Sequence, residues 1–186
     1  ARRASASAID PFVRSPIAHG TVGNVDVAAA KAAPGVLSVL TAADIEAAGL
    51  GTLPNNLPVK SRDGSPLIKP ARPLLATDRV RHVGQPVVAI IAETQAQALD
   101  AAELVGLDIQ PLPPVTTLND AVRDGAPQLH DEAPNNVCLD FQMGDAEATA
   151  KAFEAAAHVT KVHLDNNRVF VSAMEPRAAI ADFDSD

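Results

Sequence analysis

The chain has 186 residues, enough for one domain or one and a half, and its 23 acidic against 15 basic side chains give a formal charge of −8. The basic residues are dispersed along the sequence, so we expect no nucleic-acid partner. A single cysteine, Cys138, excludes an internal disulfide framework and is compatible with a cytoplasmic location, and no apolar run approaches the ~20 residues of a membrane span.

Strands and helices alternate over the first 50 residues. The pattern predicts strands at residues 12–14, 20–27 and 36–40, with a brief helix at residues 28–33. Thr41 and Asp44 have the spacing of a capping box, and Gly49 can end the helix that they begin.

The clearest single element is the apolar run from Val87 to Ala92. It has no period-2 alternation, so we expect a central strand that is covered on both faces. Thr94 is a good N-cap for the helix that follows. The residues expected on the inner face of this helix are Ala98, Leu99, Ala102 and Val105.

Loops and linkers surround this central part. Residues 51–73 are rich in Pro, Asn, Gly and Lys without apolar periodicity, which predicts a long surface loop. A strand is expected at residues 107–109, and residues 116–135 are typical of a linker with one helical turn.

The last third of the chain carries weaker patterns. Asp145 is expected to cap a helix whose apolar face holds Ala152, Phe153 and Ala156. The strands expected around this helix lie at residues 137–143, 159–164 and 177–183.

Motifs for an autonomous active site are missing from the sequence. There is no Gly-x-Ser-x-Gly elbow, no phosphate-binding loop and no Cys-x-x-Cys pair. The histidines, which show no pair at metal-ligand spacing, are His19, His82, His130, His158 and His163. The series Asp182, Asp184 and Asp186 resembles half of a calcium loop, but a solvated acidic segment explains it better.

Two polar groups need a separate explanation. His130, Asp131 and Glu132 could support acid–base chemistry, but turn residues surround them, so a structural role is favoured. Glu175 and Arg177 lie in an apolar stretch, where an unpaired charge is costly to bury. They could bind a ligand, although locking two segments together is the better interpretation.

A series of short motifs resembles the large, molybdopterin-binding subunit of molybdenum hydroxylases, the family of xanthine dehydrogenase, aldehyde oxidase and carbon monoxide dehydrogenase. Each motif is weak, but their order and spacing are specific. They include Phe12-Val13-Arg14-Ser15-Pro16, Ala33-Pro34-Gly35-Val36, Asp78-Arg79-Val80-Arg81, Val83-Gly84-Gln85-Pro86-Val87, Leu129-His130-Asp131-Glu132 and Met174-Glu175-Pro176-Arg177.

The resemblance implies an α/β fold (α+β, with a mixed sheet) in which an α/β hammerhead domain precedes the start of a molybdopterin-binding domain. The domains expected are a tail at 1–11, the hammerhead domain at 12–115, a linker at 116–143 and the beginning of the molybdopterin-binding region at 144–186. The family's cofactor contacts and catalytic glutamate are expected beyond residue 186, so no catalytic, cofactor-binding or metal residue is assigned. The candidates for a structural or interface role are Arg14, Gln85, Glu175 and Arg177.

Two functions follow from these observations. In the first, the chain is the N-terminal scaffold of a molybdenum-dependent oxidoreductase that hydroxylates an aldehyde, an N-heterocycle or a similar small molecule with water as the oxygen source. The resemblance then implies molybdopterin in the complete enzyme, with iron–sulfur and FAD cofactors on partner subunits, and predicts that this chain alone is inactive. In the second, the chain is a non-catalytic hammerhead module that docks on partner subunits. The missing initiator Met and the end directly after an apolar stretch suggest processing or a fragment.

Overall fold

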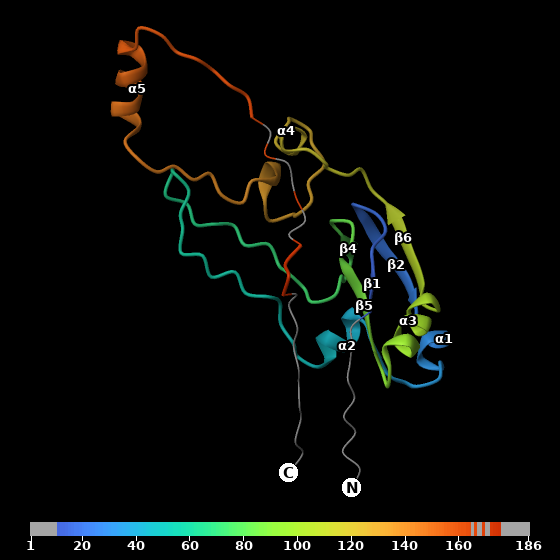
Figure 1. Cartoon of the computed structure of the whole chain (residues 1–186). Helices are drawn as coiled ribbons and strands as arrows, with labels where there is room; N and C mark the ends of the chain where they lie inside the picture. Colours follow the sequence, from blue (N-terminus) through green and yellow to red (C-terminus); the bar gives the residue numbers. More distant parts are fainter. Residues whose placement is uncertain (1–10, 165, 167–168, 170–171, 176–186) are drawn as a thin grey trace. The chain divides into compact units, whose positions relative to one another are not determined.

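The computed structural model describes residues 11–164, 166, 169 and 172–175 (Figure 1). The chain divides into two compact units, one ending at Gln142 and one beginning at Met143. No described helix is both long and apolar enough to cross a membrane.

The first sheet is built around strand β5 (Pro86–Ala92). Its antiparallel neighbours are β1 (Phe12–Arg14) and β3 (Val36–Leu40), in the order β1-β5-β3. The prediction of a central strand is confirmed, and Val88 is fully buried. Unbroken apolar runs are commonest in parallel sheets, but this strand lies in an antiparallel sheet. The run indicates that both faces of the strand are covered, and it does not indicate the direction of the neighbouring strands.

The second sheet has the order β4-β2-β6 and is also antiparallel. Its strands are β4 (Arg79–Val80), β2 (Gly20–Asp26) and β6 (Gly106–Pro111). A Cβ at Gly20 would lie 2.6 Å from Ile109 Cγ2 and 2.8 Å from the Gln110 carbonyl oxygen. Glycine therefore permits the close approach of β2 to β6.

Three helices accompany these sheets: α1 (Ala28–Lys31), α2 (Ala42–Ala47) and α3 (Gln95–Glu103). The predicted capping box of α2 is present, and Thr94 caps α3 by accepting a hydrogen bond from the Gln97 amide. The core that they help to cover is formed by Ala30, Val39, Ala76, Val80, Val87, Val88, Ile90, Ala92, Ala98 and Ala101.

The predicted inner face of α3 is wrong at one position, Leu99. Leu99 is 50% exposed, whereas Ala98 and Ala101 are buried. Leu99 follows Ala98 by about 100° around the helix axis, while positions 101, 102 and 105 return to within about 60° of Ala98. The buried face therefore consists of small residues that let the helix lie close to the sheet.

The remainder of this unit has little regular structure. The long loop contains one isolated bridge between Lys60 and Pro66, and the linker contains the short helices α4 (Leu118–Ala121) and η1 (Pro134–Asn136). The helical turn predicted in the linker is thus confirmed.

The strand predicted at residues 137–143 is wrong. Instead, this segment exchanges isolated backbone bonds with the long loop: the Arg62 amide donates to the Asp140 carbonyl at 2.8 Å, and the Ile68 amide donates to the Cys138 carbonyl at 3.0 Å. Two bonds from different arms of a loop do not make a ladder, so the extended pattern has no strand partner.

The second unit contains the helix α5 (Ala146–Ala155). Asp145 caps it as predicted, because its carboxylate accepts a hydrogen bond from the Ala148 amide at 2.9 Å. The strand predicted at residues 159–164 is absent, and the whole segment is exposed. A strand needs a neighbour for its backbone groups, and the described residues of this unit supply none. The strand expected at residues 177–183 lies outside the described residues.

Candidate functional site

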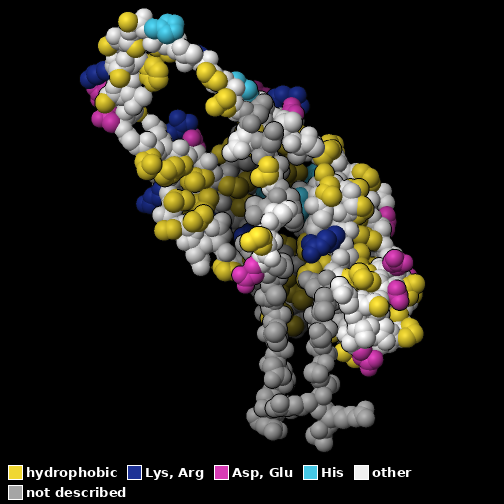
Figure 2. Space-filling view, in the orientation of Figure 1, with side chains coloured by type: hydrophobic (Ala, Val, Ile, Leu, Met, Phe, Trp, Pro, Cys, Tyr) yellow, Lys and Arg dark blue, Asp and Glu magenta, His cyan; other side chains and the backbone are white. Residues whose placement is uncertain are grey.

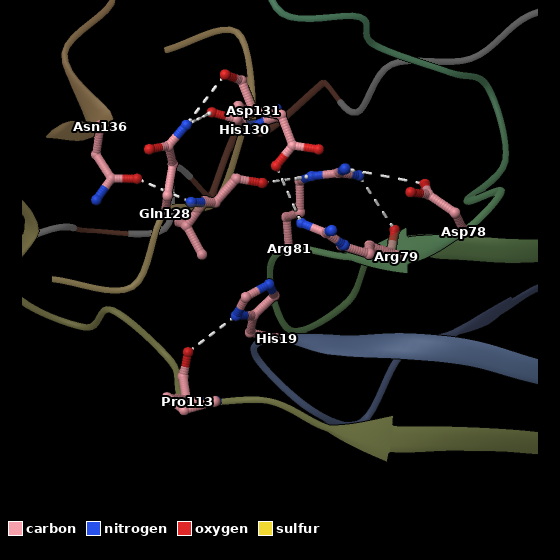
Figure 3. A network of polar contacts seen from close by, with 10 residues as sticks. His19, Asp78, Arg79, Arg81, Pro113, Gln128, His130, Asp131 and Asn136 are labelled. Carbon is pink, nitrogen blue, oxygen red and sulfur yellow. Dashed lines mark hydrogen bonds and ion pairs between the residues drawn. The ribbon is translucent and has the colours of Figure 1, made fainter. Parts of the chain in front are cut away.

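The main polar network of the first unit joins the end of β4 to the segment 128–136, here called the junction segment (Figure 3). Arg81 directly follows β4, and its Nε donates to the Leu129 carbonyl at 2.8 Å. One guanidinium nitrogen also lies 3.4 Å from the Arg79 carbonyl, and another lies 3.9 Å from the Asp78 carboxylate. Only 18% of the Arg81 side chain is exposed. Arg81 is therefore a mostly buried charge that is satisfied chiefly by main-chain carbonyls.

Two residues selected from the sequence, Arg14 and Gln85, lie at the turn that follows Arg81. The Gln85 side-chain oxygen accepts a hydrogen bond from the Arg81 amide at 2.7 Å, and Gln85 is buried. Arg14 is exposed, donates to the Gly84 carbonyl at 3.0 Å and lies 5.1 Å from the ring centre of Phe12. The structure thus brings Arg14 and Gln85 to the same turn.

The other two selected residues are not brought to this site. Glu175 is exposed in the second unit, and Arg177 lies outside the described residues. The cost of burying an unpaired charge, which the sequence suggested for Glu175, does not arise, because this residue is exposed.

Asn136 holds the junction segment in shape. Its side-chain oxygen accepts from the Leu129 amide at 2.9 Å, and its amide nitrogen donates to the Ala121 and Pro127 carbonyls at 2.9 and 3.0 Å. Its backbone is left-handed, with a φ of 57°. The sequence marks this stretch only as a turn; an asparagine pair after Ala-Pro was the signal for the left-handed backbone, since asparagine tolerates it well.

The triad His130, Asp131 and Glu132 lies in the junction segment without forming a catalytic arrangement. Burial, together with the positive charge of Arg81, lowers the pKa of His130 below its ordinary value, while Glu132 and Asp131 oppose the shift. The Asp131 carboxylate reaches Arg79 at 3.4 Å and is largely exposed. These contacts connect the segment to β4.

His19 lies beneath the junction segment, at the start of β2 (Figure 3). Its Nδ1 is 2.8 Å from the Pro113 carbonyl, so this nitrogen carries the hydrogen, because a carbonyl only accepts. His19 is 5% exposed, and its Nε2 has no hydrogen-bond partner among the described residues. Across the same part of the chain, no group of three or more His, Cys, Asp or Glu side chains could hold a metal ion.

Comparison with known proteins explains this architecture. Residues 4–113 match the family model of the aldehyde oxidase and xanthine dehydrogenase a/b hammerhead domain. The chain belongs to the aldehyde oxidase and xanthine dehydrogenase family. Residues 129–186 match the molybdopterin cofactor-binding domain, which places both matches in the order that the sequence motifs indicate.

Relatives in this family include large subunits of molybdenum hydroxylases. The chain is 37% identical to the nicotine 6-hydroxylase large subunit of Paenarthrobacter nicotinovorans, over 93% of this chain and 20% of that one. It is 31% identical to the carbon monoxide dehydrogenase large chain of Afipia carboxidovorans, over 93% of this chain and 22% of that one. The chain thus spans about a fifth of the length of these relatives.

Solved structures of the family have the same fold. A crystal structure of Cu,Mo-CO dehydrogenase matches with a TM-score of 0.65 and 30% identity, over 80% of this chain and 19% of that one. Quinoline 2-oxidoreductase from Pseudomonas putida 86 matches with a TM-score of 0.56 and 32% identity, over 66% of this chain and 15% of that one. These neighbours confirm the hammerhead fold.

The family implies a molybdopterin cofactor, but the described residues of the second unit do not form a site for it. From Met143 to Leu164 every described residue is exposed, so no enclosed set of donors is present there to bind a pterin.

Proposed function

We propose that this chain is the N-terminal scaffold of the large subunit of a molybdenum-dependent oxidoreductase. The complete enzyme would hydroxylate an aldehyde, an N-heterocycle or a similar small molecule, with water as the oxygen source. The observation that carries this proposal is the succession of two family matches, a hammerhead domain at 4–113 and a molybdopterin-binding domain at 129–186.

In this proposal the cofactor supplies the oxidation and oxygen-transfer chemistry, and this chain supplies framework and interface. The packed sheets around β5 provide a rigid body. The Arg81 network fixes the start of the second family match on that body. No residue of the chain is assigned a catalytic role, and the chain by itself is expected to have no turnover.

The partners proposed are the remainder of the large subunit and separate iron–sulfur and flavin subunits that carry the clusters and FAD. Support comes from the relatives, which are named as the large subunit, large chain or gamma subunit of complexes. One cysteine cannot supply the thiolates that an iron–sulfur cluster needs. The free Cys138 is also compatible with the cytoplasmic location that we propose.

The test is to purify the native product from its host and to measure its intact mass, molybdenum and iron on the same sample. We expect a polypeptide much longer than 186 residues, or copurifying subunits, together with molybdenum. A metal-free species of 19.2 kDa would contradict the proposal.

That contrary result would favour the second candidate, a non-catalytic hammerhead module. Exposed apolar side chains favour this alternative: Leu53, Leu57 and Phe141 are 45%, 60% and 56% exposed. Hydrophobic side chains gather over the long loop on the face shown in Figure 2. A surface of this kind is typical of a region that contacts another protein.

A further inference from the structure

The molybdopterin-binding match begins within the first compact unit. It starts at residue 129, whereas the first compact unit extends to Gln142. Residues 129–142 are therefore held by contacts with the body that carries the two sheets. Arg81 makes one of these contacts, and only 18% of its side chain is exposed.

Three features distinguish Arg81 from an ordinary surface arginine. Its guanidinium is mostly buried, and its short bond is to the main-chain carbonyl of Leu129. Its backbone is held by the buried side chain of Gln85 at 2.7 Å. A guanidinium directs its donors in one plane, a geometry that the ammonium of lysine does not reproduce.

The neighbouring contact behaves differently. Arg79 reaches Asp131 at 3.4 Å, with 31% and 78% of the two side chains exposed. An exposed ion pair of this kind contributes little, because water and salt screen it. Loss of the Arg81 bond, in contrast, leaves a buried charge with poor partners, so the charge favours the docked position of the junction segment.

We propose that Arg81 is a positioning residue: its guanidinium fixes the junction segment on β4 and so sets where the cofactor-binding part of the chain begins. This inference rests on the proposed function, because positioning the cofactor-binding part of the chain matters only in an enzyme that binds the cofactor.

The experiment compares Arg81→Lys with Arg79→Gln and Arg14→Lys in the full-length protein within its native complex. Arg81→Lys keeps the charge, and Arg14→Lys removes a similar arginine-to-carbonyl bond that lies away from the junction segment. Hydrogen exchange is measured on peptides that cover residues 128–136, molybdenum content is measured per large subunit, and thermal unfolding is used to check the fold.

For Arg81→Lys we expect exchange in residues 128–136 to accelerate by about tenfold, as for the loss of a charged hydrogen bond, with molybdenum content reduced and the unfolding temperature nearly unchanged. Both control variants should change exchange in this segment by less than about twofold, since their bonds are exposed.

Unchanged exchange in the Arg81→Lys variant would overturn the inference. So would faster exchange with full molybdenum content, because Arg81 would then be structural only. If the wild-type complex contains no molybdenum, the proposed function fails, and with it the positioning role; the exchange measurement would still show whether Arg81 holds the segment.

Discussion

The residues around β5 and the described residues after Met143 differ in whether an extended segment has a strand beside it. Both regions have apolar runs and well-capped helices, but among the described residues only the first has neighbouring strands to pair with such runs. Val88 is fully buried in β5, whereas Val162, in a stretch with a similar extended pattern, is 70% exposed. The comparison teaches that a helix satisfies its backbone bonds within its own segment, while a strand forms only where a partner supplies them.

The same substitution at these two valines tests the comparison most strongly. Val88→Asp would bury an unpaired carboxylate and should destabilise the first unit by about 4 kcal/mol or more, or prevent folding. Val162→Asp should change the stability of the chain by less than about 0.5 kcal/mol, because the side chain already faces solvent. Urea unfolding followed by circular dichroism measures both; equal losses would show that Val162 is packed.

A smaller effect is expected within the junction segment. Asn136→Ala removes three hydrogen bonds and places alanine in a left-handed backbone, so a loss of about 2–4 kcal/mol is expected. Asn135→Ala is the matched control, because it has the same left-handed backbone, with a φ of 55°. Exchange of the Leu129 amide should accelerate only in the Asn136 variant; similar behaviour of both variants would assign the effect to the backbone alone.

The helix of the second unit should respond to its cap. Asp145→Ala removes the bond to the Ala148 amide and should cost α5 about 1 kcal/mol. Asp145→Asn should retain most of the helix, because asparagine also caps well. Helical content by circular dichroism, with exchange at residues 148–150, provides the measurement. No difference between the two variants would mean that α5 does not depend on its cap.

The smallest effect concerns pH. Because the pKa of His130 is lowered on folding, the unfolded state binds more protons between the folded value and the ordinary 6.5. Its contribution to stability is therefore present above pH 6.5 and is lost as the pH falls toward the folded pKa. His130→Gln should flatten this part of the stability curve slightly, because the titrating group is removed. A variant curve that keeps the wild-type slope just below pH 6.5 would contradict this role.

Local signals in the sequence predict much of the fold. The uninterrupted run of β5, the Thr94 cap and the Thr41–Asp44 box all act within a few residues, and the structure contains each of them. The prediction about Leu99 failed because a hydrophobic residue was assumed to face inward, although its angle around the helix excludes this position.

The candidate site was less predictable for a different reason. The hydrogen bond from Arg81 is accepted by a main-chain carbonyl. Every residue has such a carbonyl, so no pair of side chains in the sequence indicates this contact. The same is true of the bonds from residues 62 and 68 to the segment that was expected to be a strand. Gln85 and its partner Arg81 both lie in recognisable motifs, but neither motif indicates that the two residues are in contact.

The long loop has a property that becomes useful once its attachments are known. Its tip at Gly64 is exposed, while Arg62 on one side is bonded to Asp140 and Ile68 on the other side is bonded to Cys138. A cut or a short insertion at the tip would leave both arms of the loop hydrogen-bonded to the segment that contains Cys138 and Asp140. Gly64 is thus a natural position for an affinity tag or a fluorescent label, which could report on assembly without loosening the body that carries it.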